Sequence, residues 1–363
     1  MHPSRWINAL FATVMVLLLI PVNAAAKKPQ PADNLLMPGE EKHMKNLRQL
    51  TFGGENAEGY FSPDSKWLIY QSHEKKGECD QIYIMNLATG ETKMVSTGGG
   101  VTTCSFFIPG TDEFIYASTH GASMECPPAP DQSLGYVWPL HKGFDIYRAR
   151  RDGTVLQQLT DTPGYDAESV VSPDGKSLVF CSIRSGDLDL YKMNIDGTNL
   201  KRLTWTLGYD GGPFFSPKGT YIVYRSNHPV GREEIDHSRY LTSHEVVSPM
   251  RLEIMLMKAD GSEQYQVTNM GTASFGPYMH PDEERIIFSS NYGDSDASNM
   301  SRMPNFELYL IHKDGTGLEK ITNNPSFDGF PMFSNDGKLL VFASNRGGKG
   351  PGETNLFLAD WID

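Results

Sequence analysis

Internal repetition is the feature that most constrains the fold of this chain. Six short segments rich in β-branched and aromatic residues recur along the sequence, and their composition is typical of β-strands. We name this series strand B, and its copies lie at 66–72, 112–118, 176–182, 220–226, 284–290 and 338–344. A second series, strand C, lies at 81–86, 144–150, 188–194, 252–258, 306–312 and 355–361.

Turn sequences separate these strands at regular places. A turn of the type Ser-Pro-Asp-Gly precedes strand B in three repeats, and a weaker copy precedes it in the other three. Its proline, aspartate and glycine each favour a tight reversal. Its six copies begin at Ser62, Ile108, Ser172, Ser216, His280 and Ser334, so consecutive copies lie 44 to 64 residues apart. The shortest spacing matches the roughly 40–45 residues of a four-stranded propeller blade. No segment of useful length shows a helical period. The repeats therefore predict an all-β fold, a six-bladed β-propeller with four antiparallel strands, A to D, in each blade.

The two ends of the chain predict how the ring closes. The last repeat stops after strand C, at Trp361-Ile362-Asp363, whereas an unaccompanied strand D, Leu47 to Thr51, stands near the start. We expect this N-terminal strand to complete the last blade, because the pairing would protect the exposed edge of strand C.

These turns and the Ile/Leu-Tyr strands resemble the repeats of the TolB-like six-bladed β-propeller family, which are WD-repeat-like. The resemblance covers residues 46–363 and implies the propeller fold. No α/β domain precedes the repeats, in contrast to TolB itself. The resemblance therefore does not imply the partner of TolB, a peptidoglycan-associated lipoprotein, and fold alone is a weak guide to function.

The first 26 residues have the pattern of a secretory signal peptide. Arg5 supplies a positive charge, Ala9 to Val22 an apolar run, and Ala24 to Ala26 a small-residue cleavage site. That run is short for a membrane span, and no comparable run follows it. We therefore expect a signal peptide at 1–26, a linker at 27–45 and the propeller at 46–363. The protein would then be periplasmic or secreted, with no transmembrane span after signal cleavage.

Charge and cysteine content limit the partners and the compartment chemistry. The formal net charge of −12 repels phosphate backbones, which excludes nucleic acid as a partner. Cys79, Cys104, Cys126 and Cys181 can pair in three ways in an oxidising compartment. We predict a Cys104–Cys126 disulfide, because both residues belong to the second repeat and approach the same face. The pairing of Cys79 and Cys181 stays open.

The long insertions predict where a site lies. Strands alternate in direction, so the B–C and D–A connections share one face of the ring, which we call the loop-rich face. The B–C loops at 119–142, 226–250, 290–305 and 344–353 are all on it. Variable loops on a rigid frame usually carry function, so we expect the ligand there. Histidines are enriched in the B–C loops, and our ligand-binding candidates among them are His120, His141, His228 and His237.

Charged residues at the blade edges are further candidates. The D–A connections contain Asp166, Asp210 and Asp328. Because strand A lines the channel, these carboxylates would ring the channel mouth and hold a polar or cationic ligand or a metal. The alternative is that each caps its own loop, as aspartate often does. Arg225, like Arg184 and Arg346, follows strand B; these residues either form surface salt bridges with loop carboxylates such as Asp187 or Glu353, or bind an anionic substrate.

The insertion at 226–250 is the richest in chemistry, with three histidines and four carboxylates that suit a divalent metal. Their spacing matches no compact metal motif, so a solvated lid is the competing interpretation. Catalytic signatures such as Gly-x-Ser-x-Gly are absent from the sequence.

Three functions remain open. The first is a non-catalytic binding or scaffolding module of the cell envelope, without a cofactor, whose partner is an envelope protein or a carbohydrate. The second is a metal-assisted lyase on acidic sugars, since some lyases with similar propeller repeats use a histidine-bound metal. The third is an accessory propeller for a separate peptidase.

Overall fold

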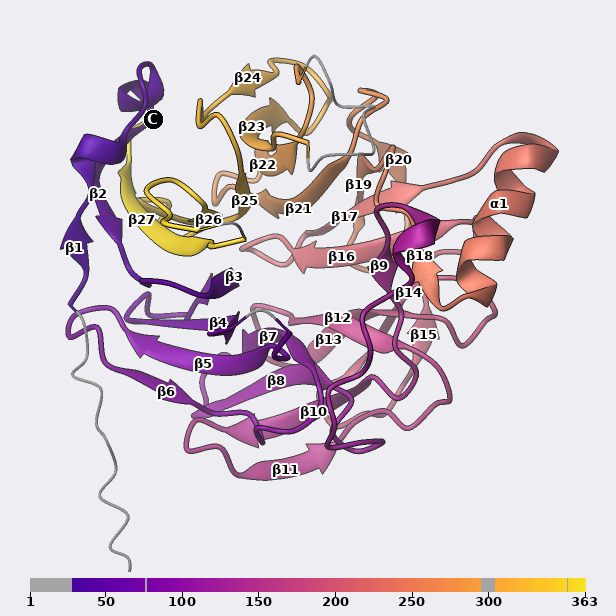
Figure 1. The fold of residues 1–363 in the computed structure, drawn as a ribbon. Coiled ribbons are helices and arrows are strands. Elements are labelled where there is room, and N and C mark those ends of the chain that lie inside the picture. The colour runs from indigo at the N-terminus through magenta and orange to yellow at the C-terminus, as the bar shows by residue number, and fades with distance from the viewer. Residues whose placement is uncertain (1–27, 76, 295–303, 351) are drawn as a thin grey trace, which may run out of the picture.

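Six antiparallel sheets stand around a central axis in the computed structural model, which describes residues 28–75, 77–294, 304–350 and 352–363 (Figure 1). The predicted six-bladed propeller is confirmed. The predicted signal peptide at 1–26 lies outside the described residues. Within those residues, no helix is both long and apolar enough to cross a membrane.

Blades 1 to 5 have their strands in chain order from the axis outward. Blade 1 contains β3 (Glu55–Phe61), β4 (Trp67–His73), β5 (Gln81–Asn86) and β6 (Thr92–Met94); blade 2 contains β7 (Thr102–Phe107), β8 (Glu113–Ser118), β10 (Asp145–Arg150) and β11 (Val155–Gln158); blade 3 contains β12 (Asp166–Val171), β13 (Ser177–Ser182), β14 (Asp189–Asn194) and β15 (Lys201–Arg202). Blade 4 contains β16 (Tyr209–Phe215), β17 (Tyr221–Asn227), β19 (Glu253–Lys258) and β20 (Tyr265–Gln266); blade 5 contains β21 (Ser274–Met279), β22 (Arg285–Ser290), β23 (Glu307–His312) and β24 (Glu319–Lys320).

The N-terminal strand closes the ring, as predicted. Blade 6 contains β25 (Asp328–Phe333), β26 (Leu339–Ser344) and β27 (Asn355–Trp361), and β2 (Met44–Gln49) pairs with β27 as its fourth strand. A hydrogen bond that recurs in other blades supports the equivalence of the N-terminal segment with strand D. The Leu356 amide donates to Thr51 Oγ1 at 2.8 Å, just as the Ile146 amide of blade 2 donates to Thr160 Oγ1 at 2.9 Å. Thr51 therefore occupies the place that a strand-D threonine has elsewhere.

The segment expected to be a linker is instead packed against blade 6. In its described part, 28–45, strand β1 (Gln30–Pro31) pairs with β2, and the 3-10 turns η1 (Asp33–Leu35) and η2 (Glu40–Lys42) follow. Glu40 is fully buried and accepts a hydrogen bond from Arg346 at 2.9 Å. The linker prediction was wrong here because a long-range ion pair, which has no local sequence signal, holds the segment.

The insertions of blades 2 and 4 meet each other. The insertion at 119–142 contains η3 (Gln132–Leu134) and β9 (Trp138–Pro139), and the insertion at 226–250 contains α1 (Gly231–Ser243) and β18 (Val246–Val247). Strands β9 and β18 pair (Figure 1). Leu241 of α1 packs with Val137 and Val246. The sequence showed no helical period because Leu241 is the only buried residue of α1.

Candidate functional site

Every innermost strand carries a β-bulge at the same place. Pairing with the neighbouring strand skips two residues in all six blades. The first skipped residue always has a left-handed backbone, with φ between 51° and 58°. These six bulge residues are Glu58, Cys104, Glu168, Gly212, Gly276 and Phe330. Such a conformation costs a non-glycine residue roughly 1–2 kcal/mol, and bulges often aim a side chain at a site.

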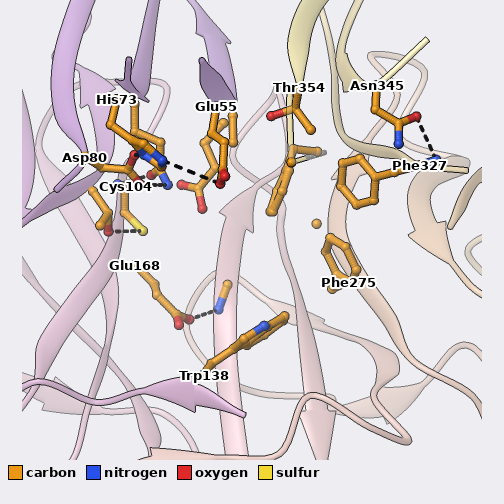
Figure 2. Close-up of a pocket in the computed structure, with 18 of the residues that line it drawn as sticks. Glu55, His73, Asp80, Cys104, Trp138, Glu168, Phe275, Phe327, Asn345 and Thr354 are labelled. Carbon is orange, nitrogen blue, oxygen red and sulfur yellow. Dashed lines mark hydrogen bonds and ion pairs between the residues drawn. The ribbon is translucent and has the colours of Figure 1, made fainter. Parts of the chain in front are cut away.

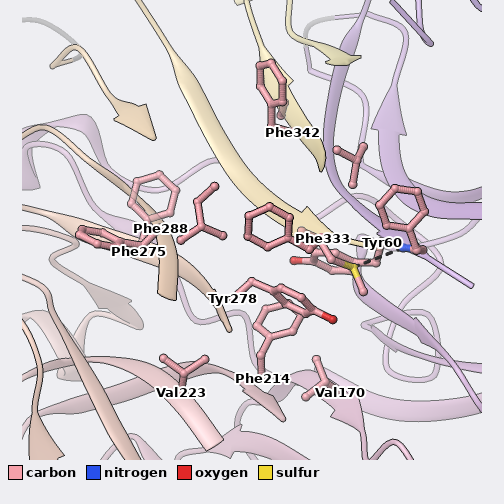
Figure 3. Close-up of a cluster of buried hydrophobic side chains, with 14 of the residues drawn as sticks. Tyr60, Val170, Phe214, Val223, Phe275, Tyr278, Phe288, Phe333 and Phe342 are labelled. Atoms are coloured by element: carbon pink, nitrogen blue, oxygen red, sulfur yellow. Dashed lines mark hydrogen bonds between the residues drawn. The ribbon is translucent and has the colours of Figure 1, made fainter. Parts of the chain in front are cut away.

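A layer of apolar side chains closes the channel two residues beyond the bulges. Tyr60 of blade 1 contacts Phe214 of blade 4, on the opposite side of the ring, with ring centroids 5.1 Å apart. Tyr278 packs against the same Phe214 ring at 5.6 Å (Figure 3). Phe106 packs against that ring at 6.2 Å. Because these rings meet across the axis, they form a floor beneath the bulge residues.

Above this floor, a cavity of about 1330 Å³ is lined by residues of the loop-rich face. The paired insertions contribute Tyr136, Trp138, Pro139 and His141 to its wall. Trp138 lies against the Arg225 guanidinium at 4.9 Å and packs edge-on to Phe275 at 5.8 Å. The predicted location of the site on the loop-rich face agrees with this cavity, because B–C and D–A connections form much of its lining.

One side of the cavity is acidic. Glu58 forms hydrogen bonds with the Cys104 thiol and the Tyr60 hydroxyl. Burial raises the pKa of Glu58 from 4.5 to about 7, although the Cys104 hydrogen bond and the charge of Arg225 oppose this shift. Burial, followed by the charge of Glu58, raises the pKa of the Cys104 thiol. Glu58 is therefore placed to exchange a proton near neutral pH, whereas Cys104 stays a neutral thiol.

Glu168 and Arg225 form a separate, paired unit. Arg225 Nη2 lies 3.0 Å from Glu168 Oε1, and Arg225 Nε donates to the Tyr209 hydroxyl at 2.9 Å. Burial lowers the pKa of Arg225, but the charges of Glu168 and Tyr209 together raise it above its usual value. The Gly212 amide also donates to Glu168. Arg225 is thus fixed in the wall as the counter-ion of Glu168.

Gly212 is required for this unit by conformation and by space. Its φ is 53°, and a Cβ atom there would lie 2.2 Å from Arg225 Nη1. We predict that Gly212→Ala lowers the free energy of unfolding by roughly 2–3 kcal/mol. Gly276→Ala is the matched control, because it has a φ of 58° but a nearest contact of 3.4 Å, and should cost only about 1–2 kcal/mol. Denaturant unfolding measures the free energy of unfolding of both variants. An equal loss in both would mean that the clash with Arg225 adds nothing to the cost of Gly212→Ala.

The other side of the cavity is aromatic. The rings of Phe275 and Phe330 are 5.2 Å apart, and those of Phe327 and Phe330 are 6.4 Å apart. Figure 2 shows Glu55, His73, Asp80, Cys104 and Glu168 on one side and Phe275 and Phe327 on the other, with Trp138 near the bottom. The cavity therefore presents an acidic wall opposite an aromatic wall.

The three predicted mouth aspartates lie inside the blades, outside the lining of this cavity. Asp166 accepts from Arg184 at 2.8 Å, Asp210 contacts His228 at 3.0 Å, and Asp328 accepts from Arg346 at 2.7 Å. All three carboxylates are at most 1% exposed. Their repetition therefore has a structural basis, because each one anchors the residue that follows strand B.

The interpretation of the arginines as surface salt bridges with Asp187 or Glu353 was wrong. Arg184 and Arg346 pair with the strand-A aspartates of their own blades, and Arg225 pairs with Glu168. Arg184 lies over the Phe180 ring at 5.2 Å, and Arg346 over the Phe342 ring at 5.1 Å. Arg184 and Arg346 thus each lie between an aromatic ring and a buried carboxylate, which the sequence alone did not indicate.

The candidate histidines are not gathered at one place. His141 lines the cavity, and the His120 ring packs at a tilt against Tyr147, with centroids 4.1 Å apart. His228 contacts Asp210, and His237 lies on the exposed face of α1. Burial lowers the pKa of both His120 and His141. Among the described residues, no group of three or more histidine, cysteine or carboxylate side chains could hold a metal ion.

The predicted Cys104–Cys126 disulfide was wrong. Cys126 pairs with Cys79, with Cα atoms 5.7 Å apart, and Cys104 and Cys181 are free thiols. The bulge of β7 turns Cys104 toward the channel, away from the insertion that holds Cys126. Cys79 lies in the B–C loop of blade 1, so the disulfide joins the loops of neighbouring blades.

Sequence reasoning missed Glu58 and Glu168, although a signal for them exists. Each bulge residue stands four positions before the first residue of the turn that precedes strand B, and in three repeats a proline follows it. Proline or glycine inside a strand often marks a bulge. Aligning the repeats on that turn would have brought the two glutamates and Cys104 into one layer.

Comparisons with known proteins agree with this architecture. A family model for the TolB β-propeller domain matches residues 128–249. Among solved structures, a putative TolB from Agrobacterium tumefaciens is 20% identical, with a TM-score of 0.53 over 85% of this chain and 91% of that one. TolB from Acinetobacter baumannii is 18% identical, with a TM-score of 0.55 over 76% of this chain and 56% of its own.

An oligogalacturonate lyase from Vibrio parahaemolyticus is 14% identical, with a TM-score of 0.50 over 86% of this chain and 93% of that one. A search of curated proteins gave no match. Identities this low show the fold alone. The protein is therefore a six-bladed propeller with a central cavity closed at one end. Its repeats and its fold are similar to those of the TolB-like β-propellers, whose family model matches part of the chain.

Proposed function

We propose that the protein is an exported binding module of the cell envelope, which captures its ligand in the central cavity of the loop-rich face without transforming it. The observation that carries this proposal is the cavity itself, with its apolar floor, its opposed acidic and aromatic walls and its paired insertions. Ligand sites are typically concave, with apolar surfaces and a few oriented polar groups. An unpartnered polar group within the described residues also supports ligand capture: the buried Ser169 hydroxyl lines the cavity without a hydrogen-bond partner there.

The alternative function, a metal-assisted lyase on acidic sugars, receives less support from this geometry. The cavity lining contains five carboxylate side chains, which would repel a polyuronate. The candidate histidines also lie apart from one another. One observation favours an enzyme, namely the placement of Glu58 for proton exchange near neutral pH. The fate of the ligand therefore has to be measured together with its binding.

We predict that Trp138→Ala lowers ligand occupancy at least about tenfold, because Trp138 lines the cavity and tryptophans often dominate binding energy. The protein is incubated with a periplasmic extract, and the adduct is measured by native mass spectrometry. Trp205→Ala is the matched control, since Trp205 is 61% exposed in a D–A connection outside the cavity lining. Equal occupancy in both variants would contradict the cavity as the binding site. Recovery of a chemically altered ligand would favour an enzyme instead.

A further inference from the structure

We infer that the ligand is an amphipathic organic cation, with an ammonium or guanidinium group beside an apolar part, and that Glu58 is the counter-ion of this group. The inference rests on the proposed function, since it names the ligand class of the same cavity. Two sources share this chemistry: a small aryl-alkyl amine, and a lysine or arginine side chain of a short peptide.

The first argument is the balance of charge in the lining. Carboxylates outnumber guanidinium groups by five to two; the carboxylates are Glu55, Glu58, Asp80, Glu168 and Glu353, and the guanidinium groups are those of Arg225 and Arg346. Arg346 is already bound to Glu40 and Asp328 within the wall, and Arg225 to Glu168. The negative charge of the cavity is therefore only partly neutralised, and a cationic ligand would supply the missing positive charge.

The second argument is the position of Glu58 among its neighbours. Its hydrogen-bond partners, Cys104 and Tyr60, are neutral groups, because burial raises the pKa of both. Glu168, the other carboxylate of the bulge layer, is held by Arg225. His73 Nδ1 lies 2.6 Å from Asp80 Oδ1, and His73 Nε2 lies 3.7 Å from Glu55 Oε2. Glu58 is thus the bulge-layer carboxylate without a cationic partner within salt-bridge distance among the described residues.

The third argument is the aromatic wall opposite Glu58. Phe275, Phe327, Phe330 and Trp138 offer π faces that suit both an apolar group and a cation. The bulge residues Gly212 and Gly276 have no side chains, which leaves space between the acidic and aromatic walls. A ligand with a charged end and an apolar end matches both walls at once. A cavity of about 1330 Å³ also has room for more than a single small amine.

The protonation of Glu58 makes the inference testable by pH. A cation pairs with the carboxylate, so binding requires Glu58, with a pKa of about 7, to lose its proton. Affinity should therefore rise as the pH increases from 6 to 8, by at most about tenfold per unit below the pKa. The groups facing Glu58 are Tyr60 on its own strand, Cys104 on β7, Glu168 on β12, Arg225 on β17 and Asp80 in the B–C loop. His73, whose pKa its hydrogen bond to Asp80 raises, loses positive charge in the same direction.

The experiment uses the mature protein and probes of matched shape. Phenethylamine, 3-phenylpropionamide and 3-phenylpropionate differ mainly in charge. Acetyl-Phe-Lys-amide and acetyl-Phe-norleucine-amide test the peptide source in the same way. Affinities are measured by ligand-detected NMR and calorimetry at pH 6, 7 and 8. The expected result is that the cationic probes bind at least tenfold more tightly at pH 8 than the neutral and anionic probes of the same shape. Tighter binding of the lysine peptide than of phenethylamine would identify a peptide as the source of the ligand.

Two variants and one control assign the effect to Glu58. Glu58→Gln removes the charge, and Glu58→Gly reproduces the bulge residue of blades 4 and 5, where glycine accepts the φ of 51° that Glu58 adopts. Both should lose the preference for cations, and Glu58→Gly should melt at the same or a higher temperature than the unmodified protein. Glu125→Gln removes an exposed carboxylate outside the cavity lining and should keep the preference.

Three results would overturn the inference. They are equal or tighter binding of the neutral or anionic probes, retention of the cation preference in both Glu58 variants, and binding of no probe. None of the three overturns the proposed function, which the Trp138→Ala experiment tests with the natural ligand.

Discussion

Replacing Glu40 by alanine should lower the free energy of unfolding by about 3–5 kcal/mol. Glu40, Arg346 and Asp328 form an ion triad in which all three side chains are fully buried. Arg346 donates to Glu40 at 2.9 Å and to Asp328 at 2.7 Å, and Glu40 also accepts the amides of Met37 and Asn323. The variant would leave part of a buried guanidinium and two amides without partners, and such groups are costly because the interior solvates them poorly.

Equilibrium denaturation in urea measures this loss, and limited proteolysis adds a local reading. The variant should become cleavable between residues 36 and 43, because Glu40 ties this segment to blade 6. Glu41→Ala is the matched control, since Glu41 is the exposed neighbour and should cost less than about 1 kcal/mol. A loss below 1 kcal/mol for Glu40→Ala would show that the triad does not hold the segment.

The fold could be predicted from the sequence because its signals are local and repeated. Each Ser-Pro-Asp-Gly turn specifies its own reversal, and six copies together specify a ring. Closure by Leu47 to Thr51 followed from counting strands in the last repeat, and the bond from Leu356 to Thr51 confirms it. Helix α1 was missed because it buries a single residue, Leu241, against another insertion. The helix is stabilised by tertiary contacts, and these leave no hydrophobic periodicity in its own sequence.

The cavity was harder to predict because its chemistry depends on residues brought together from different blades. The predicted loop-rich face does contain the cavity, since long loops form much of its lining, and His141 and Arg225 are among the lining residues. We chose three aspartates as site candidates because they recur, namely Asp166, Asp210 and Asp328. Their recurrence reflects the ion pairs that they form within their own blades. Glu58, Cys104 and Glu168 differ from blade to blade, and in a repeat protein such departures indicate function better than the shared residues do.

Removing the Cys79–Cys126 disulfide is the second change with a large expected effect. The bond closes a loop with a sequence separation of 47 residues, for which the chain-entropy model gives about 4 kcal/mol at 25 °C. The double variant Cys79→Ser with Cys126→Ser should therefore lose up to about 4 kcal/mol. Urea denaturation with and without dithiothreitol measures the loss; the reductant should destabilise the unmodified protein to the same degree and leave the double variant unchanged.

Cys104→Ala is the matched control, because it removes a thiol of the same region that is not part of the disulfide. It should keep the sensitivity to reductant, and peptide mapping without reduction should still join residues 79 and 126. A mapped bond between Cys104 and Cys126, or a loss below 1 kcal/mol in the double variant, would contradict the pairing. The disulfide also matters for the cavity, because Asp80 follows Cys79 directly and holds His73 in the acidic wall. Loss of the disulfide should therefore weaken the binding of cationic probes relative to the unmodified protein.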